Sequence, residues 1–188
     1  MTAAQPDEAD LMRASIAGDH PAFAELVRRH RSFVLALAYR LCGDRVQAED
    51  IAQDVFVRVW QALPGFRFQA VFRTWLYRIA SNVAVEQLRH IKPTADIEGI
   101  PLAAQDTPED TALRTEQCRA VRDAVLQLPL QSRLVLILRE YEGLSYKEIA
   151  STLDIPIGTV MSRLNYARQR LHHDLAPYIE RSAAEETS

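Results

Sequence analysis

Apolar residues recur every three or four positions along nearly the whole of this 188-residue chain. Around residues 48–59, for example, Ala48, Ile51, Val55 and Val59 would lie on one side of an α-helix. No segment shows the sustained two-residue alternation and turn dipeptides that indicate a β-sheet. The pattern therefore predicts an all-α protein.

Capping and breaking residues divide the first half of this pattern into helices. Asp19 is placed to cap a helix that Gly43 ends, a second helix begins after Asp44, and a third spans about residues 72–91. Together with a short segment before Asp19, these helices predict a small bundle at residues 1–92.

The next segment has the composition of a linker. Residues 93–108 hold three prolines, a glycine and several acids, and they show no apolar period, so we expect a flexible acidic linker. Four further helices separated by short breaks predict a second bundle at residues 109–178. We expect the polar tail, residues 179–188, to fray. The fold class is therefore two small helical bundles joined by the linker.

The composition excludes several classes of protein. No apolar run is long enough to span a membrane and the N-terminus lacks the features of a signal peptide, so we expect a cytoplasmic protein without direct membrane insertion. Cys42 and Cys118 are far apart, and the five histidines show no metal-ligand spacing. We therefore expect no metal, no cofactor and no enzyme activity.

Residues 144–160 have the spacing of a helix-turn-helix. Ser145 and Glu148 form a capping-box pattern, Asp154 stands where the turn needs a left-handed backbone, and Val160 is the apolar plug of the second helix. An ordinary amphipathic helix is the alternative, but cap, turn and plug all fall at the right places.

The second helix of this motif has one buried and one outward face. Val160, Leu164, Ala167 and Leu171 form a stripe that must face the core, so the polar side chains opposite are free to meet DNA. Hydroxyl and carboxamide groups can bond base edges, whereas arginines beside the stripe can reach phosphates. We expect the DNA-binding residues to be Thr159, Met161, Ser162, Arg163, Asn165, Tyr166, Arg168 and Gln169.

The helix at residues 45–62 combines aromatic rings with carboxylates. Such a surface suits a protein partner, because aromatic side chains bury well at interfaces and acids complement a basic partner. The alternative is that Phe56 and Trp60 belong to the core. The candidate partner-binding residues are Glu49, Asp50, Gln53, Asp54, Phe56 and Trp60.

Residues 66–89 interleave aromatic and basic side chains, a pattern that suits single-stranded nucleic acid, because bases stack on rings while cations hold the backbone. We expect Tyr77 to be free for stacking and Ser81 to be exposed, whereas Phe72 belongs to the core. The candidate residues are Phe66, Phe68, Arg73, Thr74, Trp75, Tyr77, Arg78, Ser81, Asn82 and Arg89.

Two sequence blocks now carry a family resemblance. Residues 48–60 (AEDIAQDVFVRVW) and residues 72–82 (FRTWLYRIASN), followed by an acidic linker and a helix-turn-helix, resemble the extracytoplasmic-function (ECF) sigma factors of bacterial RNA polymerase. The resemblance implies two domains, sigma domain 2 at residues 1–92 and sigma domain 4 at residues 109–178, in a subunit that directs core polymerase to promoters and helps to open DNA.

The resemblance also implies partners and residue roles. The block around Asp50 and Phe56 would dock on the clamp helices of the β′ subunit, and the second domain would meet the β flap. The candidates at residues 66–89 would read and melt the −10 element, with Asn82 aligned to a residue that contacts a flipped base, and the helix-turn-helix would read the −35 element. Such factors are commonly held inactive by a cognate anti-sigma factor.

Two other functions compete with this interpretation. A stand-alone helix-turn-helix regulator would share residues 144–171, but it must hold duplex DNA unaided, whereas this chain has a net charge of −3 and an acidic linker. A helical enzyme would need a catalytic set, and no such set can be justified from the order of residues.

Overall fold

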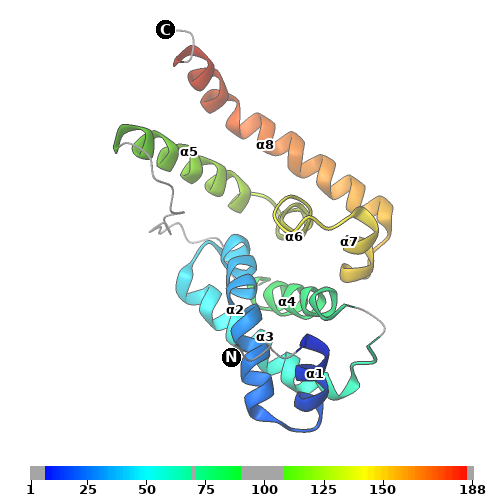
Figure 1. Cartoon of the computed structure of the whole chain (residues 1–188). Helices are drawn as coiled ribbons and strands as arrows, with labels where there is room; N and C mark the ends of the chain where they lie inside the picture. The colour runs from blue at the N-terminus through cyan, green and yellow to red at the C-terminus, as the bar shows by residue number, and fades with distance from the viewer. Residues whose placement is uncertain (1–6, 69–70, 90–107, 186–188) are drawn as a thin grey trace.

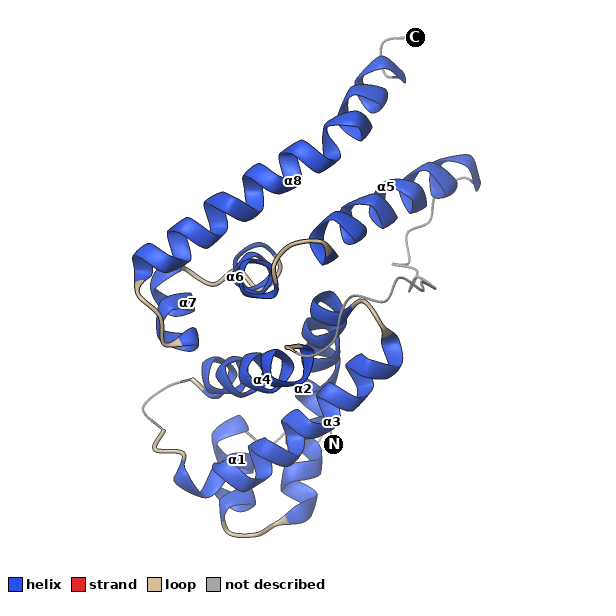
Figure 2. Ribbon diagram, turned by 180° about the vertical axis from the view of Figure 1, so that it is seen from behind, coloured by secondary structure: helices blue, strands red, loops and turns tan. Residues whose placement is uncertain are grey.

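The computed structural model describes residues 7–68, 71–89 and 108–185, with side chains at 108–116 and 179–185 left out. Every regular element in these ranges is helical, as the sequence predicts (Figure 2). The helices are α1 (Glu8–Ile16), α2 (His20–Cys42), α3 (Arg45–Ala62), a 3-10 turn η1 (Leu63–Gly65), α4 (Phe72–Leu88), α5 (Pro108–Leu126), α6 (Leu130–Glu140), α7 (Tyr146–Leu153) and α8 (Ile157–Glu185).

The predicted caps of the first bundle are present. The Asp19 carboxylate accepts a hydrogen bond from the amide of Ala22 at 3.1 Å, and Gly43 ends α2 with φ of 78°. The Asp44 carboxylate accepts a hydrogen bond from the amide of Gln47 at 2.7 Å and so starts α3. These local features set where α2 begins and ends and where α3 begins.

The helix-turn-helix is confirmed in its local geometry. Ser145 and Glu148 cap α7 reciprocally, with amide-to-side-chain distances of 2.7 and 3.3 Å. Asp154 adopts the left-handed conformation at φ 52° between α7 and α8. Val160 and Leu164 are fully buried. Their burial orients α8, so that the opposite side of the helix faces outward.

Helix α8 continues beyond the predicted end of the second bundle, as far as Glu185. The fraying expected from residue 179 stays a prediction. Pro177 lies inside the helix, where it removes one backbone hydrogen bond, but good helix formers at Ala183, Ala184 and Glu185 follow it. The predicted linker, residues 93–108, lies outside the described residues except for Pro108, which begins α5.

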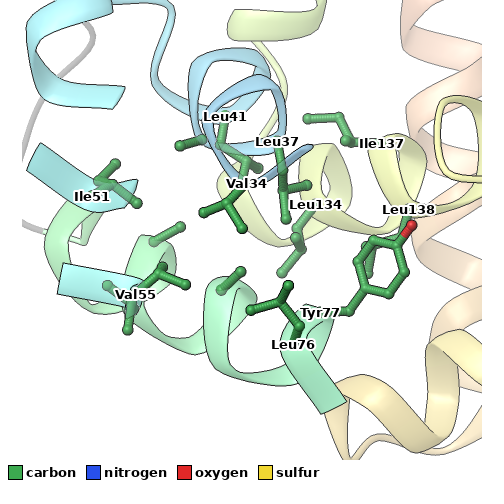
Figure 3. Close-up of a cluster of buried hydrophobic side chains, with 14 of the residues drawn as sticks. Val34, Leu37, Leu41, Ile51, Val55, Leu76, Tyr77, Leu134, Ile137 and Leu138 are labelled. Atoms are coloured by element: carbon green, nitrogen blue, oxygen red, sulfur yellow. The ribbon is translucent and has the colours of Figure 1, made fainter. Parts of the chain in front are cut away.

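The two bundles pack against each other (Figure 1). Helix α4 contacts α6 and α7, and α2 contacts α5 and α6. In Figure 3, side chains of α2, α3, α4 and α6 meet in one cluster: Val34, Leu37, Leu41, Ile51, Val55, Leu76, Tyr77, Leu134, Ile137 and Leu138. The described halves of the chain therefore share one continuous apolar core.

The junction at Gly43 gives a stability prediction. A methyl group added at Gly43 would lie 2.5 Å from a Leu126 methyl carbon across the junction, whereas one added at Gly18, also at positive φ, meets nothing within 4 Å. We expect Gly18→Ala to cost about 1–2 kcal/mol for the left-handed backbone. Gly43→Ala should cost about 1 kcal/mol more, because Leu126 must move.

Urea unfolding of both variants, followed by circular dichroism, measures the difference. Equal losses of unfolding free energy in the two variants would mean that Leu126 moves away from position 43 at no cost.

Candidate protein- and nucleic-acid-binding surfaces

The outer face of α3 presents the predicted polar candidates. Glu49, Asp50, Gln53 and Asp54 are all exposed. Two of them have partners within the chain: Glu49 pairs with Arg45 at 3.4 Å, and Asp54 accepts a hydrogen bond from the side-chain amide of Gln87. Arg58 of α3 also pairs with Glu86 of α4 at 3.2 Å, so the face is polar and accessible and is joined to α4 along its edge.

The two aromatic candidates on α3 are half-buried. The Trp60 ring stacks on His20 with centroids 4.9 Å apart and also contacts Phe23 at 4.8 Å. Phe56 packs against the core. Trp60 thus helps to join α3 to α2, which is the structural role that the sequence left open as an alternative.

Aromatic rings also cluster where the chain enters α4. Phe66 meets Phe68 and Trp75 edge-on, each at 5.1 Å between ring centroids, and it lies 6.4 Å from buried Phe72. Phe68 takes a positive φ of 54° and remains 45% exposed. A non-glycine residue at positive φ is strained, and such strain often accompanies a functional site. The exposed Phe68 ring is therefore a candidate stacking platform.

Arg13 is a neighbour of this loop that the sequence analysis missed. Its guanidinium lies 5.7 Å from the centroid of the Phe68 ring, and it also pairs with Asp10 at 2.7 Å. Arg13 belongs to α1, far from Phe68 in sequence, and only the packing of α1 near η1 brings the two together. No local sequence signal indicates such a contact.

The candidates on α4 divide into exposed and buried sets. Arg73, Arg78, Asn82 and Arg89 are exposed, and Thr74 and Trp75 are half-buried. The predictions that Tyr77 is free for stacking and that Ser81 is exposed are wrong, because these residues are 3% and 1% exposed. Tyr77 reaches the second bundle through its bond to Glu142, a contact that the local sequence pattern does not indicate.

Tyr77 has partners on three sides. Its ring meets Phe33 edge-on at 4.7 Å, its hydroxyl donates a hydrogen bond to Glu142 at 2.9 Å, and it accepts one from Arg73 at 3.1 Å. Burial, together with the Glu142 carboxylate, raises the pKa of Tyr77 to about 12. The phenol is therefore held in its protonated form as a donor.

The outer face of α8 is open. Met161, Ser162, Asn165, Tyr166, Arg168 and Gln169 are exposed, whereas Thr159 and Arg163 are half-buried. The arginines already have partners: Arg163 donates to Gln131 at 3.1 Å, and Arg168 pairs with Glu140 at 2.8 Å. A phosphate would have to displace or share these partners.

In the described residues, no group of three or more histidine, cysteine, aspartate or glutamate side chains could hold a metal ion. Within those ranges, no helix is both long and apolar enough to cross a membrane.

Comparison with known proteins assigns the family. Residues 26–93 match the model of sigma-70 region 2, and residues 118–171 match that of sigma-70 region 4. The ECF RNA polymerase sigma factor SigW of Bacillus subtilis is 35% identical over 84% of this chain and 91% of its own length. The RNA polymerase sigma-H factor of Pseudomonas aeruginosa is 36% identical over 93% and 97%.

The chain belongs to the ECF sigma factors. The structure of CnrH in complex with the cytosolic domain of CnrY is similar to this sigma factor, with a TM-score of 0.66, 30% identity, and coverage of 90% of this chain and 97% of CnrH. Both matched family models describe regions of transcription initiation factors, which favours a sigma factor over a stand-alone regulator.

The buried hydroxyl of Tyr77 gives this sigma factor a pH-dependent prediction. At neutral pH, Tyr77→Phe should lower the free energy of unfolding by about 1 kcal/mol, the usual worth of a hydrogen bond. The folded chain keeps the Tyr77 proton up to pH about 12, whereas the unfolded chain releases it near pH 10. The stability that Tyr77 provides is thus complete below pH 10 and is lost towards pH 12.

Thermal unfolding of both proteins between pH 8 and pH 12 measures this difference. The difference between wild type and Tyr77→Phe should shrink in that range. A constant difference for Tyr77→Phe would contradict the raised pKa.

Proposed function

We propose that this sigma factor binds bacterial core RNA polymerase, directs it to promoters and promotes DNA opening in the cytoplasm, in response to a stress or signal. The outer face of α3 would meet the β′ clamp helices, because exposed carboxylates and amides can complement a basic partner surface. The second domain would meet the β flap. Residues 93–108 would link the two domains across the polymerase.

The proposal that this protein reads duplex DNA rests on the exposed outer face of α8. Asn165 and Gln169 lie exposed on the side opposite the buried Val160 and Leu164 stripe. Carboxamides there can bond base edges in a major groove. We propose that this face reads the −35 element.

The −10 element would be read and melted by α4 and the loop before it. Asn82 and Arg78 are exposed on α4, and exposed Phe68 offers a ring on which an unpaired base could stack. Arg73 and Arg89 add positive charge for the backbone of the strand. A cognate anti-sigma factor would compete for these surfaces, a proposal supported by the similarity to CnrH, whose structure holds the cytosolic domain of CnrY.

Transcription from fragmented genomic DNA tests the function directly. Purified bacterial core polymerase is assayed with and without the protein, and transcript starts are sequenced. We expect discrete starts that need the protein and share a two-part upstream motif. In the same assay, Asn82→Ala should keep polymerase binding and weaken promoter opening.

If no transcript start depends on the protein, and the protein binds duplex DNA without polymerase, the result would favour a stand-alone helix-turn-helix regulator. Loss of polymerase binding by Asn82→Ala would assign Asn82 a structural role.

Two substitutions on α8 separate base reading from phosphate binding. Asn165→Ala should change the preferred −35 sequence by about 1–3 kcal/mol at one base pair, because a base contact is lost. Arg168→Ala should weaken all sequences alike, because phosphate contacts carry no sequence information. Sequencing transcripts from a library randomised at −35 measures both effects. An unchanged preference profile for Asn165→Ala would contradict the assignment.

A further inference from the structure

An aromatic ring and a guanidinium group face each other on the surface beside the loop that enters α4. Phe68 is 45% exposed, and the Arg13 guanidinium of α1 lies over its ring, 5.7 Å from the centroid. The side chain of Arg13 is itself 64% exposed. Both groups are therefore accessible to a ligand in the free chain.

The Phe68 ring is supported from one side by other aromatic rings. It meets Phe66 edge-on at 5.1 Å, and Phe66 in turn meets Trp75 of α4 at 5.1 Å. The backbone of Phe68 takes a positive φ of 54°, a conformation that strains a bulky side chain. The fold thus holds an apolar ring outward in a strained conformation, which suits a binding platform.

Asp10 sets the charge around Arg13. Its carboxylate pairs with the Arg13 guanidinium at 2.7 Å, and both side chains are well exposed. An exposed pair of this kind is weak, so the guanidinium can shift by small distances. The carboxylate would repel a phosphate that approached Arg13. It does not compete for the flat face of the guanidinium, because the N–H donors of that group lie in its plane.

The distance between the two groups suits an unpaired base. Nucleic-acid bases stack both on aromatic rings and on guanidinium planes. Two groups that sandwich one base lie about 7 Å apart, because each stacking step takes about 3.4 Å. The 5.7 Å between Arg13 and Phe68 lies between one stacking step and two. A shift of about 1 Å by the exposed Arg13 side chain would therefore admit a base.

We propose that Arg13 forms the second side of a base-binding site, in which one unpaired DNA base lies between the Arg13 guanidinium and the Phe68 ring. The proposal rests on the proposed function, because it takes the base to belong to a strand of opened promoter DNA. It adds α1 to the surface that holds this strand. Arg13 acts here through its planar face and not as a phosphate ligand.

Two substitutions of Arg13 separate stacking from its other possible roles. Arg13→Ala removes the guanidinium. Arg13→Lys keeps a cation that can still lie over the Phe68 ring or bind a phosphate, but this cation has no flat face. Arg31→Ala is the matched control, because Arg31 is an exposed arginine on α2 of the same domain, outside the proposed DNA-binding set. Circular dichroism checks that each full-length variant keeps its helices.

Binding of two labelled single strands to the full-length protein, without polymerase, tests the site. One strand is a short oligothymidylate, and the other is an abasic strand of the same length, which keeps the phosphates and lacks the bases. We expect wild type to bind oligothymidylate more tightly. Arg13→Ala and Arg13→Lys should each lose about three- to fivefold in affinity for oligothymidylate and keep their affinity for the abasic strand. Arg31→Ala should change both affinities by the same factor.

Three results would overturn the proposal: equal binding of the two strands by wild type, equal losses on both strands in Arg13→Ala, or full recovery of binding in Arg13→Lys. The salt dependence gives a second readout. Arg13→Ala should leave the slope of log affinity against log salt unchanged, and a slope smaller by about 0.7 would make Arg13 a phosphate ligand instead. Absence of protein-dependent transcripts in the polymerase assay would count against the proposed function, whereas the two strands still decide the base-binding site.

Discussion

The packing of the two domains depends on a buried cation, Arg133, which lies where α2, α5 and α6 meet. The Arg133 guanidinium donates to the carbonyls of Leu41, Leu126 and Leu128, which lie at or just beyond the ends of α2 and α5. Burial lowers the pKa of Arg133, and the carbonyls that it bonds carry partial negative charge at the helix C-termini, which offsets part of the cost of burying the cation. One side chain thus satisfies backbone groups from both domains. Without it, these carbonyls would be left buried and unpaired where the domains meet.

Features governed by neighbouring residues could be predicted from the sequence. The caps at Asp19, Asp44 and Ser145 and the left-handed turn at Asp154 depend on bonds that span only a few residues, and the structure confirms all of them. The buried stripe of α8 follows equally from helical periodicity, because Val160 and Leu164 occupy one face of a single helix. For the same reason the exposure of Asn165 could be predicted.

Features that depend on one domain meeting the other could not be predicted in the same way. Tyr77 and Glu142 are 65 residues apart, and nothing in the spacing around either residue indicates that they form a hydrogen bond. The sequence pattern of α4 therefore placed Tyr77 on an exposed face, whereas in the structure its ring packs against Phe33 and its hydroxyl bonds Glu142. The pairing of Arg168 with Glu140 was missed for a related reason, because it joins two helices whose crossing is set by tertiary packing.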